Sequence, residues 1–319
     1  MNILHLTNTT LAGAPGMLSQ AINHFSPHSS FVAQFNDKGS ERAIFHPETL
    51  YIDFSDWAQS WMRAAITNAD VIHIHNIIPT HILALMAEMD LRGKKLIYQV
   101  HSPLFEPPNL GEISQDMGLA FDAKLVIGHF HPRQFEDFQI VPNCLFRRNM
   151  FRSFSTPERD KIRILFSPSS KARMRWNAKT TPAIEQALAS LSLDPNLEIE
   201  SFTKLAPEML IMHRMGSDIS IDEVVTGSYH LVSYEGLACG NAVINGCDDL
   251  SRFCFQAAFR TNETPPFVTT NERDFLRTII DLTSDRAALE ILKARGKEFF
   301  WDIMSPERVV PIYLEIYAA

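Results

Sequence analysis

Short apolar runs alternate along the first half of the chain with stretches in which apolar residues recur at helical spacing. The short runs predict strands, and a period of about 3.6 residues predicts helices. Strands are predicted at Asn2–Leu6, Ser30–Gln34, Val71–His75, Leu96–His101, Lys124–Gly128 and Gln139–Val141, and helices at Pro15–Phe25, Trp57–Asn68 and His81–Met89. This alternation favours βαβ units and a mostly parallel sheet whose strands are covered on both faces.

A second alternation begins at Ile162–Ser167, after a change of composition that follows Pro142-Asn143. The intervening residues 145–161 are rich in Arg, Phe and Ser and have no strong period, so we interpret them as a linker. Further helices are predicted at 181–191, 206–215, 233–239, 273–283 and 286–301, and strands at 198–202, 218–221 and 242–245. The chain is therefore predicted to form two lobes, residues 1–150 and 151–304.

A final helix over residues 305–319 has clear start signals. Ser305 is predicted to cap the helix and Pro306 to take its first position, and an apolar stripe follows at Val309, Val310, Ile312, Tyr313, Ile316 and Tyr317. The whole pattern predicts an α/β protein of two doubly wound, Rossmann-like lobes. Ligands of such sheets bind beyond the carboxyl ends of the strands, so we expect a site in a cleft between the lobes.

Composition narrows the class of protein. The 319 residues carry a net charge of −8 with a sequence pI of about 5.8, the reverse of the basic excess typical of nucleic-acid binders. The sequence has no apolar run of the roughly 18 residues that a membrane span needs, and its start lacks the features of a signal peptide. Its four cysteines form no CxxC pair, so we expect reduced thiols and a cytoplasmic protein.

The most informative stretch runs from Gly227 to Ile244 and reads as a loop, a helix, a glycine turn and a buried strand. Glu235 is predicted within the first turns of that helix. A helix N-terminus suits a phosphate, and a carboxylate there can accept hydrogen bonds from the two hydroxyls of a ribose. The alternative is that Glu235 is only an acid favoured by the helix dipole.

A cation-rich loop lies between the strand at Ile164 and the helix that starts near Thr181-Pro182. It contains Ser169, Lys171, Arg173, Arg175 and Lys179. Cations that converge beside a helix start can form a pyrophosphate cradle, with bidentate contacts from Arg and a point charge from Lys. The alternative is a solvated basic loop, but the position after the first strand of the second lobe favours the phosphate site.

The first lobe offers a glycine loop, Gly13 to Gly16, between its first strand and first helix. It is not a G-x-G-x-x-G motif, so no nicotinamide cofactor is expected, and the loop either approaches a ligand closely or is a plain turn. His73 and His75 alternate on one strand, but no ligand pattern completes a metal site, so none is expected. His101 ends a strand and is therefore a candidate site residue, or else a structural histidine.

The stretch from Gly227 to Ile244 resembles the signature of GT-B-fold retaining glycosyltransferases of the glycosyl-transferase group 1 (family 4-like) type. The matching residues are Glu235, Ala238, Gly240, Val243 and Ile244. Gly227 stands where the family has a first glutamate, eight positions earlier, and Gly236 and Ala242 replace an alanine and a proline. The segment from Asp222 through Gly227 and Ser228 to Tyr229 is similar to an Asp-Gln-x-x-x-Gly-x-Tyr-Gly variant, and Lys179-Thr180-Thr181 is similar to a Lys-Gly-Thr motif.

The resemblance implies a role for each candidate. Glu235 would bind the donor ribose, and Lys179 with Arg173 or Arg175 would neutralise the donor diphosphate. His101 would contact the donor sugar, and the loop of Gly13 and Gly16 would face the phosphate and the acceptor. Ser169, Asp222, Gly227, Ser228 and Tyr229 are further candidates for nucleotide binding, and Asp222 and Glu223 could replace the missing glutamate. The terminal helix would return to the first lobe.

The implied activity is transfer of a sugar, with retention, from a nucleotide diphosphate sugar to a glycan, lipid-linked glycan or other acceptor, as in bacterial-type polysaccharide or glycoconjugate synthesis. No metal and no cofactor besides the donor are expected, because side chains supply the positive charge. The expected partners are the donor and a carbohydrate acceptor. No nucleic-acid partner is expected, and the sequence is compatible with peripheral membrane contact. The alternatives are a catalytically degenerate GT-B nucleotide-binding protein or partner subunit, and a GT-B sugar epimerase.

Overall fold

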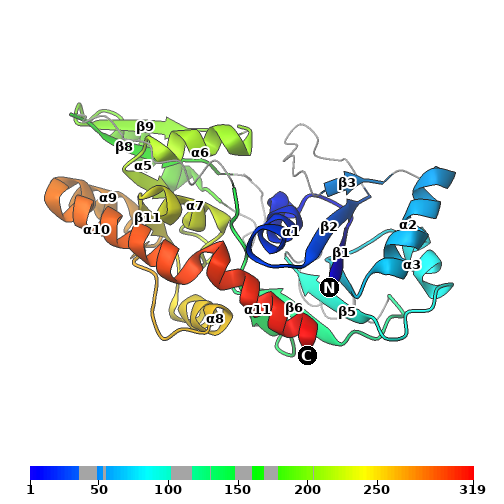
Figure 1. Ribbon diagram of the computed structural model, residues 1–319. Helices are drawn as coiled ribbons and strands as arrows, with labels where there is room; N and C mark the ends of the chain where they lie inside the picture. Colours follow the sequence, from blue (N-terminus) through cyan, green and yellow to red (C-terminus); the bar gives the residue numbers. More distant parts are fainter. Residues whose placement is uncertain are drawn as a thin grey trace. The chain divides into compact units, whose positions relative to one another are not determined.

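The computed structural model describes residues 1–35, 49–52, 55–101, 117–129, 131–147, 160–168, 179–203 and 205–319. The chain divides into two compact units (Figure 1). Unit 1 comprises Met1–Phe146 and Pro306–Ala319, and unit 2 comprises Arg147–Ser305. Each unit is built on a parallel sheet flanked by helices, which confirms the predicted α/β fold class.

Unit 1 contains a seven-stranded sheet in the order β3-β2-β1-β4-β5-β6-β7, with every pair of neighbours parallel. The strands are β1 (Asn2–Thr7), β2 (Ser29–Gln34), β3 (Thr49–Tyr51), β4 (Val71–His75), β5 (Lys95–Val100), β6 (Ala123–Ile127) and β7 (Gln139–Val141). Helices α2 (Asp56–Asn68) and α3 (Thr80–Ala87) bury their apolar side chains against one face of this sheet. That face forms the hydrophobic core of the unit.

Helix α1 (Ala14–Phe25) packs against β1 and β2, and α11 (Pro306–Ala318) packs on α1 (Figure 1). Two tyrosines of α11 bond to the sheet and the loop after it. The Tyr317 hydroxyl lies 2.8 Å from His73 Nδ1, and the Tyr313 hydroxyl donates to the Pro142 carbonyl at 2.8 Å. The terminal helix therefore returns to the first lobe, as predicted, and it covers a face of the sheet that carries polar side chains.

Unit 2 contains a five-stranded parallel sheet in the order β12-β11-β10-β8-β9. Its strands are β8 (Ile162–Phe166), β9 (Leu197–Ser201), β10 (Ile219–Ile221), β11 (Ala242–Asn245) and β12 (Val268–Thr269), and its helices are α5 (Pro182–Leu191), α6 (Pro207–Met215), α7 (Leu231–Cys239), α8 (Asp249–Phe259), α9 (Phe275–Ser284) and α10 (Arg286–Phe299). Isoleucines and leucines from the sheet, α5, α9 and α10 form its core.

Three elements of the two units, β3, β12 and α8, were not predicted from the sequence. The strands β3 and β12 are only three and two residues long, too short to show a period, and their pairing depends on neighbouring strands. Helix α8 has an N-cap, because the Asp248 carboxylate accepts from Ser251 N–H at 2.9 Å. Its apolar stripe is obscured by Leu250 and Phe253, which are 46% and 61% exposed.

The strand order reverses once within each sheet. In unit 1 the reversal lies between β1 and β4, and in unit 2 it lies between β8 and β10. At such a switch point the connections leave in opposite directions and open a crevice beyond the carboxyl ends of the two strands. The residues that follow β8 and β10 are therefore the first place to seek a ligand site in unit 2.

Candidate functional site

Polar residues follow both strands at the switch point of unit 2. Ser167 comes directly after β8, and Asp222 and Glu223 follow β10. Helix α7, which carries Glu235, packs against β10 and β11. The loop from β8 returns to the same region with Lys179, just before Thr181 caps α5. The fold thus brings the two motifs singled out in the sequence into one neighbourhood.

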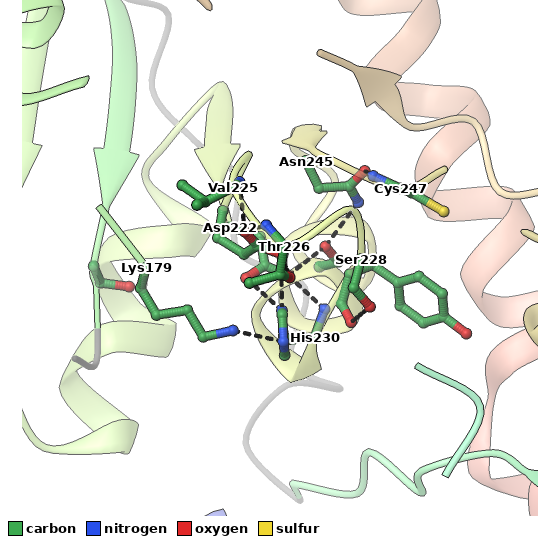
Figure 2. Close-up of polar contacts among 12 residues, drawn as sticks. Lys179, Asp222, Val225, Thr226, Ser228, His230, Asn245 and Cys247 are labelled. Carbon is green, nitrogen blue, oxygen red and sulfur yellow. Dashed lines mark hydrogen bonds and ion pairs between the residues drawn. The ribbon is translucent and has the colours of Figure 1, made fainter. Parts of the chain in front are cut away.

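Lys179, His230 and Asp222 form a chain of close polar contacts at the start of α7 (Figure 2). The Lys179 Nζ lies 2.5 Å from His230 Nε2, and His230 Nδ1 lies 3.4 Å from an Asp222 carboxylate oxygen. The other Asp222 oxygen accepts from His230 N–H at 2.6 Å and from the Ser233 hydroxyl at 2.7 Å. Asp222 therefore already occupies part of the helix N-terminus that was expected to face a phosphate.

These contacts set the charge states of the group. Burial lowers the pKa of Lys179, while the carboxylates of Asp222 and Glu223 act in the opposite direction. Burial also opposes ionisation of Asp222, but His230, Lys179 and the Ser233 hydroxyl together hold the pKa of its carboxyl below the ordinary value. The site therefore contains an ionised carboxylate beside the partly buried Lys179 cation, a pairing that an incoming anion would have to rearrange.

Glu223 shapes the loop that leads into α7. Its carboxylate accepts from the N–H groups of Val225 and Thr226 at 2.7 and 2.8 Å, and from the Thr226 hydroxyl. Figure 2 shows Val225 and Thr226 beside Asp222 and His230. Because both acidic side chains that follow β10 are engaged by protein groups, neither extends freely in the place of the missing glutamate.

Gly227 has a backbone that suits glycine. Its φ is +78°, and a Cβ added there would lie 2.9 Å from an Asp248 carboxylate oxygen. The Gly227 carbonyl accepts from Asp248 N–H at 3.1 Å and from the Ser251 hydroxyl at 2.8 Å. A glutamate at this position would meet both a left-handed backbone and a close carboxylate. The departure from the family signature therefore has a structural basis.

Glu235 lies in the fifth position of α7 and is only 6% exposed. One carboxylate oxygen lies 3.1 Å from Arg214 Nε, and the other lies 3.3 Å from an Arg147 guanidinium nitrogen. Arg214 is fully buried and also donates to the Ser167 hydroxyl at 3.1 Å. Two arginines thus fix the Glu235 carboxylate, and unused lone pairs on its oxygens remain as acceptors.

Helix α7 lies unusually close to its neighbours. A Cβ at Gly236 would lie 2.7 Å from a Val243 methyl and 3.1 Å from Ser220 Cβ, and a Cβ at Gly296 of α10 would lie 2.9 Å from a Leu237 methyl. Gly240 ends α7 with a φ of +79°. Gly236, which replaces the alanine of the family signature, therefore permits the helix to approach the sheet closely.

The other predicted residues of this half fall into two groups. Ser169, Arg173 and Arg175 lie outside the described residues, so the cation loop is represented by Lys179 alone. Ser228 and Tyr229 are fully buried, and the Tyr229 ring packs against the rings of Tyr234, Phe255 and Phe267. That packing favours a core role for Tyr229 over the predicted role in nucleotide binding.

The predicted loop from Gly13 to Gly16 is helical from Ala14 onward, because α1 begins there, and an unusual backbone precedes it. Leu11, Ala12 and Gly13 have φ values of +46°, +56° and +86°, and left-handed conformations at two non-glycine residues are costly and cluster at functional sites. A small pocket beside this loop is lined by Thr7, Thr10, Gly13, Pro15, Gly16, Val32, Gln34 and Thr49. The predicted positions Gly13 and Gly16 therefore do border a pocket.

His101 directly follows β5, as the sequence predicts, but its imidazole bonds inward. Its Nε2 lies 2.7 Å from His75 Nδ1, and its backbone N–H donates to the Asn76 amide oxygen at 2.7 Å. Burial lowers the pKa of His101 to about 3. Whether His101 also contacts a donor sugar stays a prediction.

Several residues of the site lie outside the sequence predictions. His230, Arg214 and Arg147 carry no motif of their own, and the two arginines reach Glu235 from 21 and 88 residues away. The one available signal is the position of His230 three residues before the helix predicted at 233–239; the observed α7 begins directly after His230. In unit 1, His5, His73 and His75 are the histidines that the described residues bring close enough to hold a metal ion; His5 was missed because its partners come from another strand.

No protein-family model matches this chain, and no curated protein sequence matches it. Solved structures do match. An alpha-glucosyltransferase in complex with UDP-glucose and DNA containing an abasic site superposes with a TM-score of 0.67, at 11% identity over 100% of both chains. Anabaena Alr3699/HepE in complex with UDP gives 0.65 at 12% identity over 100% of both chains. Sucrose-phosphate synthase from Thermosynechococcus elongatus gives 0.62 at 12% identity, covering 100% of this chain and 98% of that one.

At these identities the likeness establishes the fold, which is the GT-B arrangement of two Rossmann-like units. The first of these neighbours was solved in complex with DNA. The expected absence of a nucleic-acid partner, which was based on net charge, therefore stays a prediction. None of the helices in the described part of the chain combines the length and apolar character that crossing a membrane requires.

Proposed function

We propose that this protein is a glycosyltransferase that moves a sugar from a nucleotide diphosphate sugar to an acceptor. The observation that carries the proposal is that Lys179 contacts His230 at the start of α7, the helix that also carries the buried Glu235, in a fold shared with UDP and UDP-glucose complexes. UDP-sugars are the first donors to test for that reason.

In the proposed donor complex the diphosphate lies beside Lys179 and His230. An incoming phosphate would compete with Asp222 for the positive charge of Lys179 and for the His230 backbone N–H. Arg173 or Arg175 would complete the cradle. Glu235, held by Arg214 and Arg147, is preorganised to accept from the ribose hydroxyls without first losing side-chain freedom.

We propose that transfer proceeds with retention and needs no divalent ion for the diphosphate, because the cations stabilise the negative charge that develops on the leaving group. His101, Gly13 and Gly16, which belong to unit 1, are further residues that we propose to act in the reaction. The acceptor is a glycan, lipid-linked glycan or other hydroxyl compound, as in bacterial-type polysaccharide or glycoconjugate synthesis, and the protein would act in the cytoplasm.

A second candidate is a nucleotide-binding protein without transferase activity. The observation that favours it is the engagement of Asp222 and Glu223 by protein groups at the place where Gly227 removes the family glutamate. Such a protein would still bind the nucleotide, because Lys179 and Glu235 are retained.

The test is release of the nucleoside diphosphate from a panel of UDP-, GDP- and ADP-sugars, with and without cell-extract acceptors. Wild type should release one nucleotide selectively, and EDTA should leave the rate unchanged. A Lys179→Met variant should lose activity, whereas Lys297→Met, an exposed lysine of the same unit, should keep it. Binding of the nucleotide without turnover of any donor would identify the second candidate.

A further inference from the structure

Unit 1 contains a cluster of buried histidines on the sheet face that α1 and α11 cover. His5 on β1 pairs in register with His73 on β4, and His75 lies two residues further along β4. All three are fully buried. One ring nitrogen from each lies within 4.8 Å of those of the other two. Parallel strands in this register therefore place three imidazoles around one point in the interior.

The outer nitrogen of each ring is held by a hydrogen-bond partner. His5 Nε2 lies 3.0 Å from the Ser30 hydroxyl, and His73 Nδ1 lies 2.8 Å from the Tyr317 hydroxyl. His75 Nδ1 lies 2.7 Å from His101 Nε2. Metal-binding histidines typically have such a partner on the second nitrogen, which fixes the ring and its tautomer. Ser30, Tyr317 and His101 would each serve as that partner.

The proton positions in the cluster can be worked out from one hydroxyl group. Ser30 donates to the Ser19 hydroxyl at 2.9 Å, so its oxygen must accept from His5 Nε2–H. The lone pair of His5 then lies on Nδ1, which is 2.9 Å from His75 Nε2. Without an ion, His75 Nε2–H must donate to His5, and His101 Nε2–H must in turn donate to His75.

This arrangement leaves buried acceptors without donors. His101 Nδ1 would be unprotonated, and it lies beside the Asn143 amide oxygen, which is also an acceptor. Both atoms, together with His73 Nε2, are buried and lack a hydrogen bond of full geometry within the described residues, with Asn143 next to His101 and Gln99 next to His73 as their nearest polar neighbours. Unsatisfied buried polar atoms are costly and call for an explanation. Three of them in one network point to a missing component.

A metal ion at the centre would satisfy all three atoms at once. If His75 binds the ion through Nε2, the proton of His75 moves to Nδ1, and this Nδ1–H donates to His101 Nε2. His101 then carries its proton on Nδ1 and donates to Asn143, and His73 Nε2 becomes the third ligand. The number of protons is unchanged, because His75 and His101 only change tautomer.

The distances allow this rearrangement. Tetrahedral ligands at about 2.0–2.1 Å from an ion lie roughly 3.3 Å apart. The His5 and His75 nitrogens, 2.9 Å apart, would have to open by about 0.4 Å, and the third nitrogen would have to move inward. Side-chain rotations of this size are small, although the interior must accommodate them.

We propose that His5, His73 and His75 form a buried binding site for an imidazole-binding transition-metal ion. Within the described residues the cluster includes no carboxylate or thiol. Imidazole ligands suit zinc and copper alike, but burying net charge is costly, so between the two we choose monovalent copper(I). The proposed ligands are separate from the candidate donor residues of unit 2, and metal binding is measured without transferase activity; His101, which bonds to His75, is also a proposed site residue of the transferase.

The experiment uses the full chain, stripped of metal by chelator dialysis. Copper(I) is titrated anaerobically in competition with a chromophoric copper(I) chelator, and zinc(II) is titrated separately with a zinc indicator. We expect one copper(I) ion per chain. His73→Phe, which keeps a ring stacked on His75, should weaken binding by a factor of about 100 or more, and Ser30→Ala by about 10 to 100. His81→Ala, an exposed histidine of the same unit, should bind like wild type.

Nitrogen-15 NMR of the histidine rings provides a readout that does not depend on affinity. Binding should move the proton of His101 from Nε2 to Nδ1, although His101 is not a ligand. Absence of binding tighter than about 10 µM for either ion would overturn the proposal, as would equal affinity in His73→Phe. Binding with an unchanged His101 tautomer would place the ion elsewhere, and tighter binding of zinc would overturn the choice of ion.

Discussion

Replacing Gly227 by alanine should destabilise unit 2 more than the same change at Gly240. Both glycines have left-handed backbones, with φ of +78° and +79°, and an alanine in that conformation costs about 1–2 kcal/mol. A Cβ at Gly240 meets nothing closer than a flexible Lys297 side chain at 3.4 Å, whereas at Gly227 it lies 2.9 Å from the Asp248 carboxylate. Gly240→Ala therefore isolates the backbone cost.

The additional cost at Gly227 comes from the helix cap. Asp248 caps α8 by accepting from Ser251 N–H, and loss of a cap costs about 0.5–2 kcal/mol. We therefore expect Gly227→Ala to lower the free energy of unfolding by about 1.5–4 kcal/mol, against about 1–2 kcal/mol for Gly240→Ala. Urea unfolding followed by circular dichroism measures both costs.

An equal cost for the two variants would refute the steric argument for the absence of the family glutamate. Gly227→Asn supplies a further check, since asparagine tolerates a left-handed backbone better than alanine but still has a Cβ. It should recover part of the backbone cost and none of the loss caused by contact with Asp248.

Three further outcomes follow from the geometry of unit 2. Gly236→Ala should lower the free energy of urea unfolding by about 1–3 kcal/mol, because the added methyl overpacks against Val243. Adding Val243→Ala should relieve much of that cost in the double variant. A Gly236→Ala variant that is more stable than wild type would contradict the close packing. Arg214→Met should lower the free energy of unfolding by about 3 kcal/mol or more, because the buried Glu235 carboxylate then keeps only Arg147 as its cationic partner within the described residues. The cost should be markedly smaller in a Glu235→Gln background. Additive effects of the two substitutions would mean that the pair is not coupled. The pKa of Asp222 is held below 3.8, so its contribution to stability is present above that pH and is lost as the pH falls further. Asp222→Asn should therefore flatten the decline in stability below about pH 4. Parallel pH profiles of stability in wild type and Asp222→Asn would contradict this.

The alternation of strands and helices was predictable because periodicity depends on neighbouring residues. Val71–His75 and Ala242–Asn245 form strands as predicted, and α11 packs on the first unit. The short strands β3 and β12 were not predictable, since their pairing depends on distant residues. Exposed Leu250 and Phe253 hid the amphipathic pattern of α8.

The candidate site was predictable only in part. The positions of Lys179 and Glu235 followed from motifs, and the fold brings both to one switch point. The partners of Glu235 were not predictable, because Arg214 and Arg147 approach it from other elements. The histidine cluster likewise depends on the register between β1 and β4, which places His5 beside His73. Local sequence patterns contain no information about that register.

The most direct test of the central claim is a calorimetric titration of the full chain with UDP, GDP, ADP and CMP, for wild type and Lys179→Met. The claim predicts that wild type binds a nucleoside diphosphate, with UDP tested first, and that Lys179→Met weakens the binding at least about tenfold, equivalent to about 1.4 kcal/mol. No binding of any nucleotide, or equal affinity in wild type and Lys179→Met, would contradict the assignment of the donor site to unit 2.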